Sequence, residues 1–326
     1  MVEITLVEAV NLALARAMQD DDHVIVFGED VALNGGVFRA TQGLFDRFGP
    51  DRIKDTPLAE GAMAGLSVGL AAQGFRPVVE IQFMGFIYPT IDQLLSHAAR
   101  LRNRTRGRLT CPMVLRAPFG GGIHAPEHHS ESTEAMFAHI PGLRVVVPSS
   151  PARAYGLLLA AIHDPDPVVF LEPKRIYRAI KEEVPDTGNA IAMDKCVMLR
   201  EGMDLTLVTW GAMVREVLET AATLEQDGIS ADVIDVATLK PLDTETILAS
   251  VKKTGRCVIV HEAPYTGGFG AEIAARIAEF ALTSLLAPVR RVTGYDIVMP
   301  LPKSEHYYMP SSNRIVAAAR NVLEYA

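Results

Sequence analysis

The stretch RIKDTPLAEGAMAGLSVGLAAQG, residues 52–74, decides how this chain is organised. Thr56 is a good helix cap and Pro57 suits the first helical position, so the pattern predicts a helix that begins here. A capping-box acid would stand one position before Glu60, so capping does not explain this carboxylate. The run 61–72 has no charged residue on any face, which predicts a buried helix.

Three glycines, Gly61, Gly65 and Gly69, recur every four residues along this predicted helix. Each costs about 1 kcal/mol relative to alanine, so the repeat needs a structural reason. Close packing of another helix at a subunit or domain junction supplies one. Two interpretations of Glu60 follow: a poorly solvated carboxylate suited to proton chemistry, or an ordinary first-turn glutamate favoured by the helix dipole.

The composition predicts a globular protein of a reducing compartment. The chain has 326 residues, 49% hydrophobic and 21% charged, which allows two domains with sizeable cores. A net charge of -8 argues against a nucleic-acid partner. Three scattered cysteines favour neither a disulfide framework nor a cysteine metal site. The N-terminus lacks signal and transit patterns, and no apolar run reaches membrane-spanning length, so we expect a cytoplasmic protein without membrane contact.

Alternation of apolar runs and helical patterns predicts an α/β protein with two doubly wound domains. Thr5 and Glu8 form a capping box before the first helix, and HVIVFGED, 23–30, reads as a buried parallel strand that ends in acids. The polar, turn-rich region around 182–190 suggests a linker. We therefore expect one α/β domain over 1–185, a linker over 186–200, and a second, smaller α/β domain over 201–326.

A zinc pattern, H-x-x-E-H, occurs at His124, Glu127 and His128 and defines one alternative, a zinc hydrolase. The motif needs a helix to bring both histidines onto one face. Pro126 and the upstream glycines disfavour that helix, so this interpretation ranks low. His129, on a loop expected to leave a strand's carboxyl end, stands where doubly wound folds bind ligands, although an ordinary surface histidine also explains it.

Glu60 followed by Gly65 and Gly69 resembles the motif of the pyrimidine-binding domain of thiamine diphosphate enzymes. The wider context is similar to the beta subunits of the 2-oxo acid dehydrogenases, the decarboxylating component of lipoate-dependent complexes. The resemblance covers nearly the whole chain, in the same order, and its motifs are specific together although none is alone. They are DTPLAE, FGEDV, EIQF, HHSES, PGLRVVVPSSP, VVFLEPKRIYR, KTGRCVIVHEAP and RVTGYD.

The resemblance implies a pyrimidine-binding domain, a C-terminal transketolase-like domain, and thiamine diphosphate as cofactor. Glu60 would be the catalytic acid that shares a proton with the pyrimidine ring. Leu58, Gln82 and Phe86 match further cofactor-binding positions. The histidine before the serine in HHSES matches His129, which would position the oxo acid or move protons during acyl transfer.

Phosphate binding distinguishes this chain from a complete thiamine enzyme. Relatives hold Mg²⁺ and the diphosphate with a Gly-Asp-Gly element, and none occurs in this sequence. The resemblance therefore implies half of a site, completed by an alpha subunit in an α2β2 tetramer that holds most of the Mg²⁺ contacts. Some relatives bind a structural K⁺ where Asp164 stands, and the C-terminal domain would dock on the dihydrolipoyl acyltransferase core.

The substrate class stays open among the members of this family. Several motifs favour a branched-chain 2-oxo acid, whereas the GEDVALNGGVFRAT segment, 28–41, is also typical of bacterial pyruvate enzymes. An acetoin dehydrogenase beta subunit is an alternative, as is a non-catalytic assembly subunit. Val298 departs from the family, since many relatives carry proline two residues after the aspartate that matches Asp296.

Overall fold

Alternating strands and helices form two units in the computed structural model, which describes residues 3–325. Unit 1 holds the chain up to Phe119 together with Met136–Met193, and unit 2 holds Gly120–Ala135 together with the chain from Asp194. The expected division ran continuously along the chain, whereas the short segment Gly120–Ala135 belongs with the C-terminal half. The boundaries of independently folding domains stay a prediction.

Unit 1 is built on a parallel sheet. Its strands are β1 (Glu3–Thr5), β2 (Val24–Gly28), β3 (Ile53–Asp55), β4 (Arg76–Glu80), β5 (Val114–Phe119), β6 (Arg144–Val146), β7 (Val168–Pro173) and β8 (Lys181–Glu183). Its helices are α1 (Leu6–Asp20), α2 (Leu44–Phe48), α3 (Glu60–Ala72), α4 (Ile91–Ser96), α5 (Leu101–Arg104) and α7 (Pro151–His163), with 3-10 turns η1 (Met84–Phe86), η2 (Tyr88–Thr90), η3 (Ala98–Arg100) and η5 (Lys174–Ile176). A further helix, α6 (Glu134–His139), crosses the boundary between the two groups of residues.

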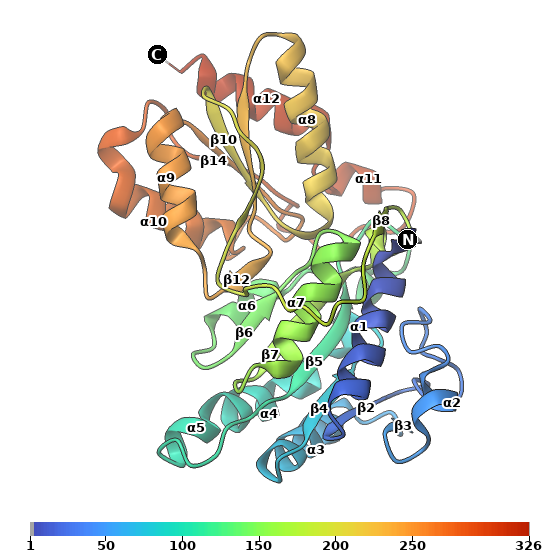
Figure 1. Ribbon diagram of the computed structural model, residues 1–326. Coiled ribbons are helices and arrows are strands. Elements are labelled where there is room, and N and C mark those ends of the chain that lie inside the picture. The colour runs from blue at the N-terminus through green and yellow to red at the C-terminus, as the bar shows by residue number, and fades with distance from the viewer. Residues whose placement is uncertain (1–2, 326) are drawn as a thin grey trace. The chain divides into compact units, whose positions relative to one another are not determined.

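The strands of unit 1 run in the order β6-β7-β5-β4-β2-β3, all parallel. Helix α1 packs against α7, and α3 packs against β4 and α4 (Figure 1). Separately, β1 and β8 pair antiparallel. The predicted capping box at Thr5 and Glu8 is confirmed at the start of α1. A fully buried strand such as β2 matches the expectation for a parallel sheet covered on both faces.

Helix α3 begins later than the sequence suggested. Thr56 does not cap it, because its N–H donates to the Gly28 carbonyl over 2.9 Å and so continues the pairing of β3 with β2. Proline at 57 also disfavours a helical conformation for Thr56. The helix starts at Glu60, its N-cap is Ala59, and no side chain caps it. Glu60 is thus the first helical residue.

The first two glycines of the repeat face neighbours within unit 1, whereas the third faces open space. A Cβ at Gly61 would lie 3.1 Å from the Pro89 carbonyl oxygen, and one at Gly65 would lie 3.3 Å from Gln93 Oε1. At Gly69 it would meet nothing within 4 Å. The helix is also not buried on every side as expected, since Leu66 is 51% exposed.

We therefore expect alanine substitutions at different glycines of this helix to change the stability of the chain differently. Gly69→Ala should stabilise the chain by about 0.5–1 kcal/mol through helix propensity alone. Gly61→Ala gains the same propensity but presses against backbone, and overpacking costs about 1–3 kcal/mol. Thermal unfolding of the two variants should rank Gly69→Ala above Gly61→Ala. The reverse order would show that the Pro89 segment yields freely.

A buried ion cluster joins three neighbouring strands of unit 1. Arg116 on β5 is 1% exposed, and its guanidinium donates to Glu172 Oε1 on β7 over 2.6 Å and to Glu80 Oε2 on β4 over 2.9 Å. The Tyr177 hydroxyl also donates to Glu172 over 2.6 Å. Burial raises the pKa of Glu80, and Glu172 adds to this while Arg116 opposes it. One arginine thus compensates two carboxylates inside the sheet.

Unit 2 has its own sheet, in the order β14-β13-β10-β11-β9. The strands of this sheet are β9 (Val197–Arg200), β10 (Leu205–Thr209), β11 (Ala231–Asp235), β13 (Cys257–Val260) and β14 (Arg290–Val292), and the short strand β12 (Thr238–Lys240) of unit 2 is not part of it. Its helices are α8 (Val214–Gln226), α9 (Thr244–Thr254), α10 (Gly270–Ala281), α11 (Glu305–Tyr308) and α12 (Ser312–Leu323), with 3-10 turns η4 (Glu127–His129), η6 (Gly211–Met213) and η7 (Leu282–Ser284). Helices α8 and α12 lie on one side of the sheet and α9 and α10 on the other (Figure 1).

The expected linker over 186–200 contains structure that the sequence analysis missed. Its last four residues form β9, which pairs antiparallel with β11 at the edge of the unit 2 sheet. The strand is short and only partly buried, so its period-2 signal was weak.

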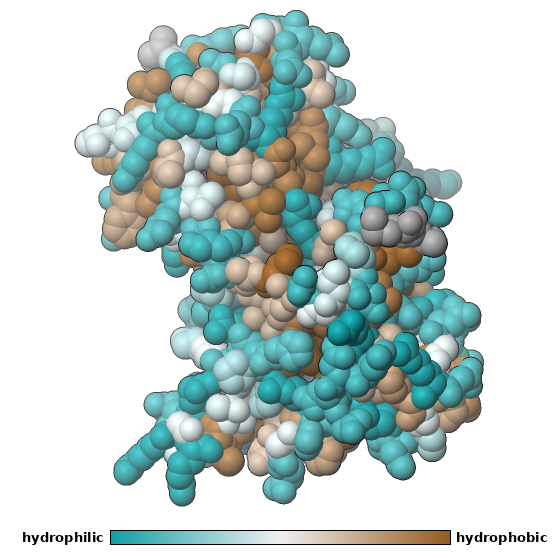
Figure 2. All heavy atoms as spheres, in the orientation of Figure 1, coloured by the Kyte–Doolittle hydropathy of each residue, from teal (hydrophilic) through white to brown (hydrophobic). Residues whose placement is uncertain are grey.

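Figure 2 shows hydrophilic residues over much of the viewed surface with hydrophobic ones among them. Within residues 3–325, no helix combines the length and apolarity needed to cross a bilayer.

Candidate active site

Three polar side chains follow the carboxyl ends of adjacent strands in unit 1. Glu29 follows β2, Gln82 follows β4, and Glu60 begins the helix after β3. Strand β2 lies between β4 and β3, so the three chain segments leave the sheet side by side. Doubly wound sheets bind ligands at this edge. The arrangement gathers two carboxyl groups and an amide from distant parts of the sequence.

Glu29 is the carboxyl group that the sequence analysis did not single out. It is 4% exposed, and its Oε1 has no hydrogen-bond partner within the part of the chain that the structure describes. Burial raises the pKa of Glu29, and the negative charges of Glu60 and Asp30 raise it further. Glu29 and Glu60 are therefore close enough to interact electrostatically, and the protonated form of Glu29 is favoured.

The predicted cofactor-binding residues surround this pair to different extents. Gln82 Nε2 lies 3.5 Å from the Glu29 carbonyl oxygen and 3.4 Å from Asp30 Oδ2, so it belongs to the same group. Phe86 lies in η1, with its ring edge-on to Phe83 at 6.0 Å between centroids. Leu58 is 80% exposed, an unusual state for a leucine just before a buried site.

His129 belongs to unit 2, because the segment Gly120–Ala135 makes most of its contacts there. It is the last residue of the 3-10 turn η4 and is half-buried. Its N–H donates to the Pro126 carbonyl over 2.9 Å. The zinc pattern does not form a helix: His124 has φ 57°, and η4 begins only at Glu127. Among residues 3–325, no group of three or more His, Cys, Asp or Glu side chains could hold a metal ion.

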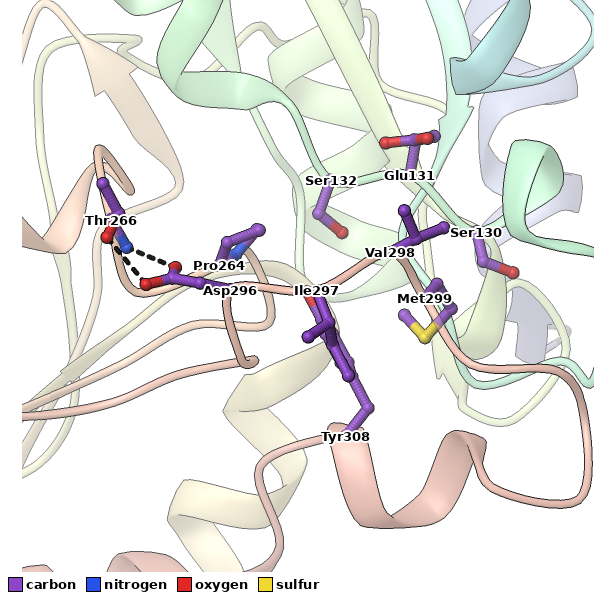
Figure 3. A pocket seen from close by; sticks show the side chains of 10 residues that line it. All are labelled: Ser130, Glu131, Ser132, Pro264, Thr266, Asp296, Ile297, Val298, Met299 and Tyr308. Atoms are coloured by element: carbon purple, nitrogen blue, oxygen red, sulfur yellow. Dashed lines mark hydrogen bonds between the residues drawn. The ribbon is translucent and has the colours of Figure 1, made fainter.

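A pocket of about 550 Å³ adjoins the segment after His129 (Figure 3). Ser130, Glu131 and Ser132 line it from one chain segment, and Asp296 and Val298 line it from another. Asp296 accepts hydrogen bonds from the Thr266 N–H over 2.8 Å and its hydroxyl over 2.7 Å. Val298, where many relatives carry proline, is 70% exposed and lines this pocket. It belongs to unit 2, whereas Glu60 belongs to unit 1.

Glu134 adds a titratable carboxyl close behind the His129 loop. Burial raises the pKa of Glu134 to about 7, and the negative charge of Glu262 raises it further. The side chain is fully buried. Its pKa is raised in a part of unit 2 that also holds Glu262.

Asp164 caps the C-terminal end of α7. Its carboxylate forms an ion pair with Arg144 at 2.9 Å and accepts the Asp166 N–H over 2.8 Å. The side chain is 11% exposed. Because carboxylates of this kind are already compensated, a cation here would depend on backbone carbonyl oxygens as well.

Sequence reasoning missed Glu29 because its distinguishing property is burial. A usable signal was present: an acid directly follows the apolar run of β2, at the end of a buried parallel strand. Unpaired acids at strand carboxyl ends often serve ligands in this fold class. The pocket of unit 2 carried no such signal, since its walls come from separate segments.

Comparison with known proteins identifies the two halves of the chain. Residues 2–180 match the family model "Transketolase, pyrimidine binding domain", and residues 194–315 match "Transketolase, C-terminal domain". A solved structure titled "Split gene transketolase, inactive beta4 tetramer" shares the fold with a TM-score of 0.81, covering 99% of each chain at 24% identity. The fold is thus that of a transketolase-like protein with two α/β domains.

Two relatives of known function show which family of transketolase-like proteins this chain belongs to. The pyruvate dehydrogenase E1 component subunit beta of Acholeplasma laidlawii is 52% identical over 99% of this chain and 98% of its own length. The subunit of the same name from Bacillus subtilis is 49% identical over the full length of both chains. The chain belongs to the beta subunits of the thiamine diphosphate-dependent 2-oxo acid dehydrogenases, as the sequence motifs predicted. It is an oxidoreductase component of a 2-oxo acid dehydrogenase complex.

Proposed function

We propose that this chain supplies the pyrimidine-binding half of a thiamine diphosphate site and acts in oxidative decarboxylation of pyruvate. The observation that supports this most is the set of polar residues after β2, β3 and β4, with Glu60 at the first turn of α3 and Glu29 buried beside it. The absence of Gly-Asp-Gly from the sequence supports a diphosphate half on another polypeptide.

The residues present fit a pyrimidine ring. Glu60 is half-buried, Phe86 offers an aromatic neighbour, and exposed Leu58 offers an apolar surface that a flat ring would cover. Glu60 would hold a proton at a carboxyl oxygen and share it with a pyrimidine ring nitrogen. Thiamine diphosphate, when bound, supplies the electron sink that loss of CO₂ requires.

Glu29 would assist by lowering the negative charge beside Glu60. Burial raises its pKa, which favours its protonated form relative to a free carboxyl group. Gln82 would hold the Glu29–Asp30 segment in place through its amide. The two carboxyl groups differ in their surroundings, since Glu29 is 4% exposed and Glu60 is only half-buried.

His129 would position the oxo acid or carry protons while the acyl group passes to the lipoyl group of a dihydrolipoyl acyltransferase. Its place on a loop that follows β5 supports this role, because this loop also leaves a strand's carboxyl end. Ser130 and Glu131, the next two residues, border an open pocket that gives the loop access to solvent.

The partners we propose are an alpha subunit in an α2β2 tetramer and the acyltransferase core, reached through the C-terminal domain. Helix α3 supports the first, because Ala62, Leu66 and Gly69 form an exposed stripe on a helix without charge. Mg²⁺ would be held mainly by the alpha subunit. A structural K⁺ would lie at the end of α7 beside Asp164, and a cytoplasmic location remains our expectation.

Pyruvate is proposed because the relatives reported above are named for it, although several motifs had favoured a branched-chain substrate. Co-expression with the alpha subunit and assay on pyruvate, branched-chain 2-oxo acids and acetoin tests this. We expect kcat/KM for pyruvate to exceed that for branched-chain acids by about 10-fold or more, the discrimination expected for a few methylene groups. Preference for a branched-chain acid or for acetoin would overturn the substrate assignment.

A further inference from the structure

The loop that carries His129 is closed at its base. The Gly120 N–H donates to the Glu131 carbonyl over 2.9 Å, so the chain leaves β5 and returns to nearly the same place. Residues 120–131 all belong to unit 2. Inside the loop, the Ser130 N–H donates to the Glu127 carbonyl over 2.9 Å and fixes the turn around His129.

Two buried carboxylates hold the first half of this loop by its backbone. Glu305, at the start of α11, is 1% exposed and accepts the Gly122 N–H over 2.6 Å and the His124 N–H over 2.9 Å. Glu262, after β13, is 3% exposed and accepts the Gly121 N–H over 2.9 Å. Hydrogen bonds to charged acceptors are about twice as strong as neutral ones.

The backbone conformation is built for these contacts. Gly120 and Gly122 both have φ 85° and His124 has φ 57°, which turns successive N–H groups toward the acids. A Cβ at Gly120 would lie 2.5 Å from Glu262 Oε1, so only glycine permits this approach. The two carboxylates therefore depend on glycine at Gly120 and on the positive φ angles of this loop for their contacts with its backbone.

We propose that Glu305 and Glu262 are positioning residues for acyl transfer, which fix the place of His129 through the backbone of residues 120–131. The proposal rests on the role proposed above for His129. A loop held only by surface contacts would let the histidine drift, and a displacement of about 1 Å at a reacting centre can cost on the order of 100-fold in rate. Neither acid needs to touch the substrate.

Glu305→Gln tests the idea with the least change in shape. The amide keeps one acceptor oxygen, but its NH₂ group must face either the Gly122 or the His124 N–H, and two donors repel. In the complex with the alpha subunit, we expect acylation of a lipoyl domain to slow by about 10- to 100-fold. Decarboxylation, followed with dichlorophenolindophenol as the electron acceptor, should change little.

A double-mutant cycle with His129→Ala separates positioning from general damage. If Glu305 acts through His129, Glu305→Gln should slow acylation in the wild-type background and have little further effect in the His129→Ala background. Equal losses in both backgrounds would overturn the inference. The exposed Glu279→Gln on α10 is the matched control and should change neither half-reaction.

The cycle also separates this inference from the proposed function. If His129→Ala leaves acylation unchanged, the role of His129 fails, and the positioning proposal falls with it. If His129→Ala slows acylation but Glu305→Gln does not, only the positioning proposal fails. Should Glu305→Gln prevent assembly, as judged by sedimentation, Glu262→Gln carries the same cycle, because it removes the charge of the carboxylate that accepts the Gly121 N–H.

Discussion

Glu60→Gln in the complex with the alpha subunit should lower turnover by about 10²- to 10⁴-fold, the range for loss of a general acid–base group. The amide preserves the shape of the side chain but cannot hold the acidic proton that the pyrimidine ring would share. Glu29 should not replace it, since Glu29 is buried and follows β2, whereas Glu60 is the first residue of α3. Steady-state assay at saturating cofactor measures the loss.

The matched control is Glu245→Gln, an exposed glutamate in the first turn of α9. It loses the same helix-dipole interaction, worth about 0.3–1 kcal/mol, without touching the site. Its turnover should match that of the unmodified protein. Near-normal turnover of Glu60→Gln would place Glu60 with Glu245 as an ordinary helix-end residue.

Arg116→Met should destabilise unit 1 by about 3–5 kcal/mol, because it leaves Glu80 and Glu172 buried without their cation. The methionine fills part of the volume, so the effect is mainly electrostatic. Urea unfolding of the chain, followed by circular dichroism, gives the change in the free energy of unfolding.

Two controls separate charge from packing. Adding Glu80→Gln and Glu172→Gln to Arg116→Met removes the uncompensated charges and should restore much of the stability. Arg215→Met removes an exposed arginine from α8 and should change the free energy of unfolding by less than about 0.5 kcal/mol. A loss from Arg116→Met no larger than that from Arg215→Met would contradict the compensating role of this arginine.

Local chemistry explains which parts of the fold the sequence revealed. Thr5 and Glu8 form a capping box from neighbouring residues, and that prediction is confirmed. The predicted start of α3 was wrong because it depends on a non-local hydrogen bond, from the Thr56 N–H to the Gly28 carbonyl. The packing of Gly61 against Pro89 was equally invisible, since the sequence shows that glycines recur but not what they face.

The candidate site likewise contains residues that the sequence indicated and residues that only the structure revealed. Motif spacing pointed to Glu60, whereas Glu29 became visible only when its burial and its interaction with Glu60 were known. The carboxylates of Glu262 and Glu305 lie far along the chain from the His129 loop that they hold. No local pattern links them, so only the tertiary structure could bring them into the account.

Isothermal titration of thiamine diphosphate and Mg²⁺, into the chain alone and into its complex with the alpha subunit, tests the central claim most directly. The claim is that this chain holds only the pyrimidine half of the site, because it has Glu60 but no Gly-Asp-Gly element. We predict weak or undetectable binding to the chain alone and tight, Mg²⁺-dependent binding to the complex. Tight, Mg²⁺-dependent binding to the chain alone would contradict the split site.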